Sequence, residues 1–309
     1  MRFLKERYSW LIVLGIFWLQ GCASTPHDDT SSRTAGDLSS DNLDLLFATE
    51  FPVASKDEAL AKATRAYRDG ELDKAQFYLV RALKFDTSDT DVLAQIGNLH
   101  ARQKDAVLAA RAFQFALQQE PQHAASLEGM GLLYFKSGND DEAQKHLELA
   151  IASAPNLWRS YNVLGVIADR REEFELAQSY YDAALEIQPL SDSVLINRGF
   201  SKYLVKDYQA AALDFYTVAE RSDSGKAWRN LALVYARQGW YETAIETFMK
   251  AGDESYAYNE TGAIAMSNGD ADAALQYLTE AVRLSPTYFA QAEKNLAELR
   301  KKNTQSYSN

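Results

Sequence analysis

Residues 90–123 read TDVLAQIGNLHARQKDAVLAARAFQFALQQEPQH, and residues 124–157 read AASLEGMGLLYFKSGNDDEAQKHLELAIASAPNL. The two segments align without a gap, and each has glycine at its eighth position and alanine at its twentieth and twenty-seventh. Residue types that recur at a fixed interval of 34 indicate stacked structural repeats. Because one such unit cannot bury its own apolar face, its neighbours must cover it.

The same pattern extends outward from these two segments to cover residues 56–288. The repeats are 56–89, 90–123, 124–157, 158–191, 192–224, 225–254 and 255–288. Their eighth residues are Ala63, Gly97, Gly131, Gly165, Gly199, Ala232 and Gly262, and their twentieth are Ala75, Ala109, Ala143, Ala177, Ala211, Ala244 and Ala274. Two antiparallel helices approach closely only where the facing residues are small, so we expect positions 8 and 20 to oppose each other.

Turn and helix-end residues complete the repeat. Glycines stand where a left-handed turn between two helices is expected, and prolines stand where the second helix must end. These residues are Gly70, Gly138, Gly239 and Gly269, and Pro121, Pro155, Pro189 and Pro286. The pattern resembles the tetratricopeptide repeat (TPR). The resemblance implies an all-α TPR solenoid of about seven helix-turn-helix repeats, followed by a capping helix and a disordered tail at 289–309.

Two features depart from the pattern. Position 7, normally apolar, holds Arg198 and Thr261. Repeat five is one residue short and repeat six is four residues short, which is about one helical turn. We therefore predict a bend or a shortened helix at the junction of repeats six and seven. The alternative is a trimmed loop with normal stacking.

Composition and motifs argue against catalysis and nucleic-acid binding. The chain of 309 residues has a formal net charge of −11, whereas a nucleic-acid surface needs clustered cations. Its one cysteine excludes internal disulfides and multi-cysteine metal sites. The four histidines form no ligand pair, and the chain lacks HExxH and phosphate-loop motifs. We therefore expect no catalytic residue, no metal and no cofactor.

The first 21 residues match a secretory signal peptide, with a basic start at Arg2 and Lys5 and a ten-residue apolar run at 10–19. That run is too short to span a bilayer. Leu19-Gln20-Gly21-Cys22 resembles the bacterial lipobox, which implies cleavage before Cys22 and acylation, including palmitate, at that cysteine. Ala23 then implies sorting to the outer membrane, on its periplasmic face. The alternative is an ordinary signal with a chance cysteine.

A tether is expected between the anchor and the repeats, at residues 22–55. It is rich in Ser, Thr and Asp, a composition that buries too little apolar surface to order itself. Within it, residues 41–51 contain several apolar side chains. They form either a short helix docked on the first repeat or a short linear motif.

The resemblance also implies a peptide-binding groove, because positions 2, 5, 9, 12 and 13 of TPR first helices line the concave face. The predicted groove residues are Tyr67, Arg68, Asn98, Arg102, Phe135, Lys136, Arg159, Asn162, Asp169, Arg170, Phe200, Tyr203, Lys226, Arg229, Arg237, Tyr256 and Asn259. Position 13 supplies a basic stripe, which suits an extended peptide with carboxylates or a free C-terminus. The alternative is that these cations only solvate the helices.

Residues 228–244, which read WRNLALVYARQGWYETA, most resemble the TadD family of tight-adherence (Flp) pilus assembly proteins. This resemblance implies a lipid-anchored scaffold that assists pilus or secretin assembly, with protein partners, the membrane contacted through acyl chains, and no nucleic acid. Two alternatives are the type IV pilus pilotin family (PilF/PilW) and the NlpI family of adaptors that recruit peptidoglycan hydrolases or proteases.

Overall fold

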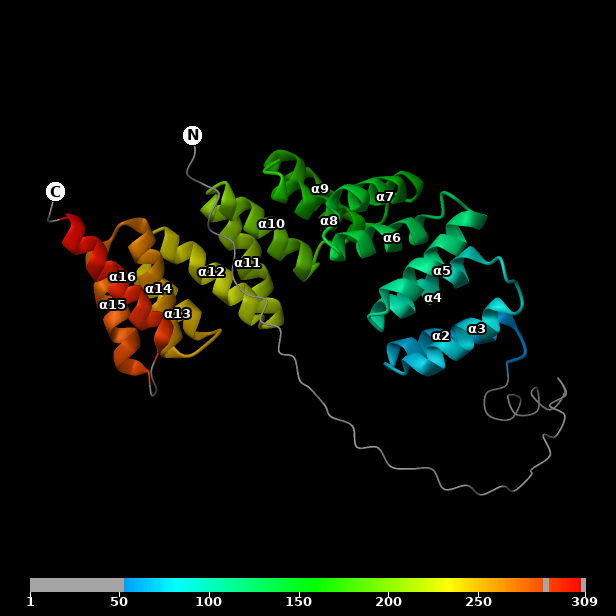
Figure 1. Cartoon of the computed structure of the whole chain (residues 1–309), viewed down its shortest axis with the longest axis horizontal. Helices are drawn as coiled ribbons and strands as arrows, with labels where there is room; N and C mark the ends of the chain where they lie inside the picture. Colours follow the sequence, from blue (N-terminus) through cyan, green and yellow to red (C-terminus); the bar gives the residue numbers. More distant parts are fainter. Residues whose placement is uncertain (1–52, 286–288, 307–309) are drawn as a thin grey trace, which may run out of the picture. The chain divides into compact units, whose positions relative to one another are not determined.

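The computed structural model describes residues 53–285 and 289–306, with side chains as far as residue 301 (Figure 1). Regular structure within these ranges is α-helical, and none of the helices there is both long and apolar enough to cross a bilayer. The predicted signal peptide at 1–21, Cys22 and the segment at 41–51 lie outside the described residues.

Each predicted repeat forms a pair of helices joined by a tight turn. The first helices are α2 (Lys56–Arg68), α4 (Thr90–Arg102), α6 (Ala124–Lys136), α8 (Trp158–Arg170), α10 (Asp192–Leu204), α12 (Gly225–Arg237) and α14 (Glu254–Asn268). The second helices are α3 (Leu72–Leu83), α5 (Ala106–Gln119), α7 (Asp140–Ser153), α9 (Phe174–Ile187), α11 (Tyr208–Ser222), α13 (Tyr241–Met249) and α15 (Ala271–Leu284).

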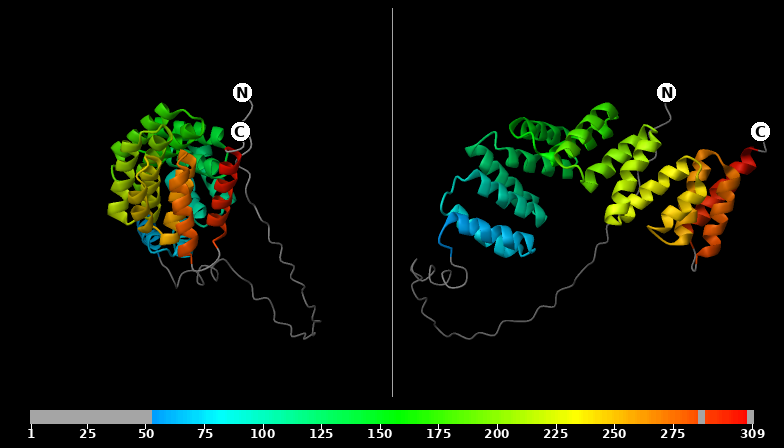
Figure 2. Two further views of the ribbon diagram at one scale, coloured as in Figure 1. Left: turned by 90° about the vertical axis from the view of Figure 1, so that its left-hand side faces the viewer. Right: turned by 180° about the vertical axis from the view of Figure 1, so that it is seen from behind.

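The helix pairs stack in chain order (Figure 2). Each first helix packs on the second helix of its own repeat, and each second helix packs on the first helix of the next repeat. First helices from α4 onward also contact the first helices of the adjacent repeats. This arrangement confirms the predicted all-α solenoid of helix-turn-helix repeats.

The small residue at position 8 permits close packing within each pair. A Cβ atom added to Gly131 would lie 2.6 Å from Leu147 Cγ, and one added to Gly165 would lie 2.6 Å from Tyr181 Cε1. Leu147 and Tyr181 both occupy position 24. The Ala143 carbonyl oxygen at position 20 is 3.3 Å from the Cβ added to Gly131. In repeat three, position 8 therefore faces position 20, as expected, and in both repeats it lies against position 24.

The turn within every repeat places its fifteenth residue in the left-handed region. The four predicted glycines adopt this conformation, but three repeats have a residue with a side chain there. The fifteenth residues are Gly70, Lys104, Gly138, Glu172, Lys206, Gly239 and Gly269, with φ values between 62° and 86°. Turn geometry is thus uniform although the sequence at the turn is not.

A buried ion pair accounts for the unexpected Arg198 at position 7. Its Nη2 and Nε atoms donate to the two carboxylate oxygens of Asp214 on α11, at 2.7 and 2.9 Å. Lys202 Nζ lies 2.9 Å from the same carboxylate, which is only 2% exposed. A buried charge persists when it is paired and hydrogen-bonded, so α11 supplies the anion that this position requires.

The short sixth repeat has a shortened second helix, as one of the two alternatives predicted. Helix α13 has 9 residues, whereas α9 has 14. It still packs against α14. The sixth repeat is therefore short because its second helix ends early, and repeats six and seven still pack together. A change of stacking angle at this junction stays a prediction.

A last helix, α16 (Ala290–Ser306), covers the final repeat. It packs against α15 and α14 and buries Leu296 and Leu299. Asn295 of α16 donates from Nδ2 to Asn259 Oδ1 at 3.1 Å. The helix continues to Ser306, so it takes up most of the segment 289–309 where a capping helix and a tail were expected.

Candidate binding groove

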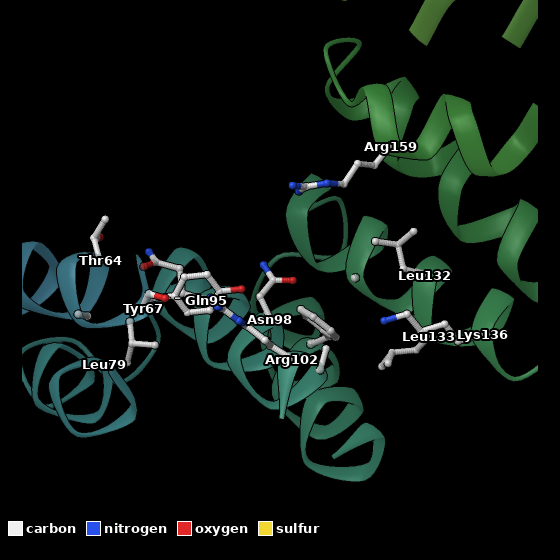
Figure 3. A pocket seen from close by; sticks show the side chains of 14 residues that line it. Thr64, Tyr67, Leu79, Gln95, Asn98, Arg102, Leu132, Leu133, Lys136 and Arg159 are labelled. Atoms are coloured by element: carbon white, nitrogen blue, oxygen red, sulfur yellow. Dashed lines mark hydrogen bonds between the residues drawn. The ribbon is translucent and has the colours of Figure 1, made fainter. Parts of the chain in front are cut away.

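A groove of about 560 Å³ lies between α2, α4, α6 and α8 (Figure 3). Three cationic side chains line it, those of Arg102, Lys136 and Arg159, together with the amides Gln95 and Asn98. Among the described residues that line it there is no carboxylate. We call this site the basic groove. Figure 3 shows Lys136 and Arg159 extending from the α6 and α8 side, opposite Gln95 and Asn98.

The basic groove brings together some of the predicted site residues but not all of them. Five of them line it, from four consecutive repeats: Tyr67, Asn98, Arg102, Lys136 and Arg159. The remaining predicted residues lie outside this lining: Arg68, Phe135, Asn162, Asp169, Arg170, Phe200, Tyr203, Lys226, Arg229, Arg237, Tyr256 and Asn259.

Three of the five cations at position 13 are held by the neighbouring repeat. The Arg102 guanidinium lies 4.4 Å from the centre of the Tyr67 ring, and its Nη1 donates to the Tyr67 carbonyl oxygen at 2.8 Å. Arg170 lies 4.6 Å from the centre of the Phe135 ring, and its Nη1 is 2.7 Å from Asp140 Oδ1. Both arginines therefore link a first helix to the repeat before it.

Arg237 forms the third such link. Its Nε donates to Tyr203 Oη at 2.8 Å, and its Nη1 donates to Ser267 Oγ at 2.6 Å. The other two position-13 cations, Arg68 and Lys136, make no ion pair or ring contact with any residue that the structure describes. The predicted stripe thus consists of three linking arginines and two cations that have no ion pair or ring contact within the described part of the chain.

The linking arginines follow a period of two repeats. Position 12 is aromatic in repeats one, three and five, and position 13 is arginine in repeats two, four and six. The aromatic residues are Tyr67, Phe135 and Tyr203, and the arginines are Arg102, Arg170 and Arg237. Each link joins an aromatic residue to the arginine of the next repeat, through the ring for Arg102 and Arg170 and through the tyrosine hydroxyl for Arg237. This alternation was present in the sequence and could have identified the links.

Beyond the basic groove, Asp169 stands between repeats four and five. It accepts hydrogen bonds from Tyr181 Oη at 2.7 Å and Ser201 Oγ at 2.6 Å. Burial raises the pKa of the Asp169 carboxyl, and the two hydroxyl donors oppose this shift. The nearby Asn162 accepts from Asn197 Nδ2 at 3.0 Å. This part of the first-helix row is therefore occupied by bonds between repeats.

Asn259 is a correction to the predicted site, because it is not accessible. Its side chain is 1% exposed, since α16 covers it and Asn295 donates to it. The capping helix takes the place that a following repeat would occupy. A partner cannot reach this residue while α16 is in place.

Sequence reasoning missed several lining residues, among them Gln95 and Gly129, which both occupy position 6. A Cβ atom added to Gly129 would lie 2.3 Å from Phe113 Cζ, so this glycine admits the Phe113 ring against α6. A second glycine, two residues before Gly131, was the available signal. The structure gives position 6 a place in the groove that the family pattern did not supply.

The described residues hold no group of three or more His, Cys, Asp or Glu side chains that could bind a metal ion. The absence of a metal, a cofactor and a catalytic residue stays a prediction for the whole chain.

Three family models, all described as the tetratricopeptide repeat, match the chain. One matches residues 100–161, a second 241–289, and a third both 159–189 and 225–251. These matches fall within the helix pairs described above. The chain is a TPR repeat protein. The TPR is a fold for protein–protein interaction, and the matches include no catalytic family.

Among curated proteins, this TPR protein is similar to anaphase-promoting complex subunit 3 of Schizosaccharomyces pombe. The two are 22% identical over 134 residues, which is 43% of this chain and 20% of that protein. The chain therefore matches about a fifth of the length of this curated relative.

Solved structures with similar folds come from several systems. A TPR protein from Parabacteroides merdae has a TM-score of 0.51 at 17% identity, covering 79% of this chain and 98% of its own. PilW, described as a type IV pilus biogenesis factor, has a TM-score of 0.53 at 20% identity, covering 67% of this chain and 98% of PilW. A chain of the Cut9–Hcn1 complex has a TM-score of 0.57 at 16% identity, covering 83% of this chain and 51% of that one. At these identities the likeness establishes the fold alone.

Proposed function

We propose that this TPR protein is a lipid-anchored, non-enzymatic scaffold that binds an extended acidic segment of a partner in the basic groove. The observation that carries this binding mode is the lining of the groove: three cations, two amides and no carboxylate, in a chain of net charge −11. Cations attract carboxylates, and arginine can bind them with two parallel hydrogen bonds. The amides of Gln95 and Asn98 can both donate to and accept from a peptide backbone.

The proposed setting is the assembly of a tight-adherence (Flp) pilus or its outer-membrane secretin. The lipobox-like residues 19–22 and Ala23 support an anchor on the periplasmic face of the outer membrane. Several acyl chains hold a protein to a bilayer far more firmly than one, because each buried CH₂ contributes about 0.8 kcal/mol. The likeness to PilW supports the fold only, so the choice of pilus system depends on residues 228–244.

The groove is tested with charge reversals that leave the links between repeats intact. Lys136→Glu with Arg159→Glu removes two groove cations that make no ion pair with described residues. We expect this variant to lose at least about tenfold in partner capture, because repulsion replaces attraction at two sites. Partners are cross-linked in intact cells, purified from solubilised envelopes and identified by mass spectrometry.

The matched control is Lys104→Glu with Lys206→Glu. It makes the same change of net charge at two exposed turn positions, where repeat four already has Glu172 in the same conformation. Equal capture by the groove variant and this control would contradict binding in the basic groove. Recovery of peptidoglycan hydrolases in place of secretin or pilus proteins would contradict the pilus assignment.

The anchor has an independent test. Mass spectrometry of the mature protein should find Cys22 as the first residue with acyl chains attached, and Cys22→Ser should release the protein from membranes. A mature N-terminus without fatty acid would contradict the anchor without affecting the groove.

A further inference from the structure

Repeat five departs from the other repeats along the C-terminal half of its first helix and at the residue that follows it. It has Phe200 at position 9, Leu204 at position 13 and Val205 at position 14. Most repeats have Lys or Arg at position 13, and those without it have Leu204 or Ser267. The three side chains are 44%, 43% and 49% exposed. At positions 13 and 14 every other repeat has a charged or polar residue. At position 9 other repeats also have apolar residues, but Phe200 is the exposed one.

We call Phe200, Leu204 and Val205 the repeat-five patch. Phe200 and Leu204 are one turn apart on α10 and so share a face. The Phe200 and Tyr203 rings are stacked with centres 6.0 Å apart, and Tyr203 lies 5.7 Å from the Tyr208 ring. Exposed apolar residues that cluster in this way mark binding surfaces more often than isolated ones do.

The fold does not require this apolar surface. Other repeats of this chain form the same helix pair with a small polar residue at each of the three positions: Thr64 at position 9, Ser267 at position 13 and Asn268 at position 14. A helix pair of this kind can therefore form without an apolar residue at any one of these positions.

The patch lies on the same row of first-helix positions as the basic groove, two first helices beyond Lys136. Positions 9 and 13 of the first helices line the groove in repeats two and three, and α6, α8 and α10 pack in succession. Two steps between packed helices span roughly 16–20 Å. An extended peptide rises roughly 3.3 Å per residue, so about six residues connect Lys136 to Leu204.

We propose that the repeat-five patch is a second subsite for the same extended partner, and that it binds an aliphatic or aromatic side chain about six residues away from the acidic segment. This inference rests on the proposed function, because the acidic segment places the chain in the groove. The partner segment is therefore acidic over repeats one to four and apolar over repeat five.

Synthetic peptides test the two subsites separately. One peptide carries an aspartate block, a Gly/Ser spacer of about six residues and a Leu-Phe pair, and it is made with the blocks in either order. A matched control peptide has Ser-Ser in place of Leu-Phe. Of the two block orders, we take the one that the wild-type protein binds more tightly. We expect fluorescence anisotropy to show that this Leu-Phe peptide binds about tenfold more tightly than its Ser-Ser counterpart, because an apolar side chain leaves water.

The variant Phe200→Thr with Leu204→Ser and Val205→Asn installs residues that the array itself has at these positions. We expect it to bind both peptides equally, with the wild-type affinity for the Ser-Ser peptide, since no charge changes. The control Leu213→Ser removes an exposed apolar residue of α11, where repeat four has Ser179. It should keep the preference for Leu-Phe. Circular dichroism and melting establish that both variants fold.

Each result decides between the claims. If the wild type binds both peptides equally, the second subsite is wrong and the basic groove stands. If it binds neither peptide, the acidic-peptide function fails and the subsite with it. If the Leu-Phe preference survives in the patch variant, apolar binding occurs elsewhere. A wild-type dimer that the patch variant abolishes, seen by sedimentation, would assign the patch to a second copy of the chain.

Discussion

At the scale of single residues, the groove cations differ in what holds them. Arg102 and Lys136 occupy the same position in successive repeats, but only Arg102 is fixed by the ring and carbonyl of the preceding Tyr67. Replacing Arg102 therefore removes a link between repeats as well as a charge. Lys136 has no such bond among the described residues, so its replacement reports on binding alone.

A buried hydroxyl without a partner gives a stability prediction. Thr261 Oγ1 makes no hydrogen bond with any described residue, and the side chain is fully buried. We expect Thr261→Val to stabilise the fold by about 1 kcal/mol, since valine keeps the shape and removes the unpaired polar group. The measurement is the midpoint of urea unfolding.

The control for this prediction is Thr247→Val. Thr247 Oγ1 donates to the Thr243 carbonyl oxygen at 2.6 Å, so its replacement should bring no gain. A loss of stability in Thr261→Val would show that its hydroxyl is satisfied in solution.

Asp169 gives a pH prediction. Burial raises its folded pKa above the unfolded value, so the folded chain binds this proton more readily. The contribution of Asp169 to stability is therefore full below the unfolded pKa and is lost as the pH rises through the folded pKa. Asn at this position does not titrate. We expect the stability of Asp169→Asn relative to the wild type to be higher at about pH 7 than at about pH 4.

Thermal melting of both proteins at the two pH values measures this difference. The raised pKa would be contradicted by a stability difference that is the same at both values, or that favours the wild type more at the higher one.

At the scale of elements, each helix pair depends on a left-handed residue in its turn. Three repeats place a residue with a Cβ atom there, which is less favourable than glycine by roughly 1–2 kcal/mol in the folded state. Glycine loses more conformational freedom on folding, which offsets part of this difference. Glycine in place of Lys206 in the turn of repeat five should therefore make the fold more stable.

We expect Lys206→Gly to raise the free energy of unfolding by about 0.5 kcal/mol, as the balance of these two effects. The reverse change, Gly239→Lys, should lower it by a similar amount, because φ at Gly239 is 80°. Both are measured by urea unfolding. Opposite signs for the two substitutions support the account, and a loss in Lys206→Gly would argue against it.

At the scale of the whole molecule, the 34-residue period predicted the helix pairs because small residues at position 8 and glycines at the turn have local causes. The contacts between repeats were harder to predict. The burial of Asn259 depends on α16, and Arg198 is tolerated because Asp214 lies opposite it. Which cations remain unpaired depends on aromatic residues about 35 positions away, such as Tyr67 for Arg102.

The central claim, that a partner lies in the basic groove, is tested most directly by site-specific photo-cross-linking in cells. A photoreactive residue replaces Asn98, which lines the groove, or Val107, an exposed apolar residue of α5 outside its lining. The account predicts a covalent adduct with a partner protein from position 98 and none from position 107. An adduct from position 107 alone, or equal adducts from both, would contradict it.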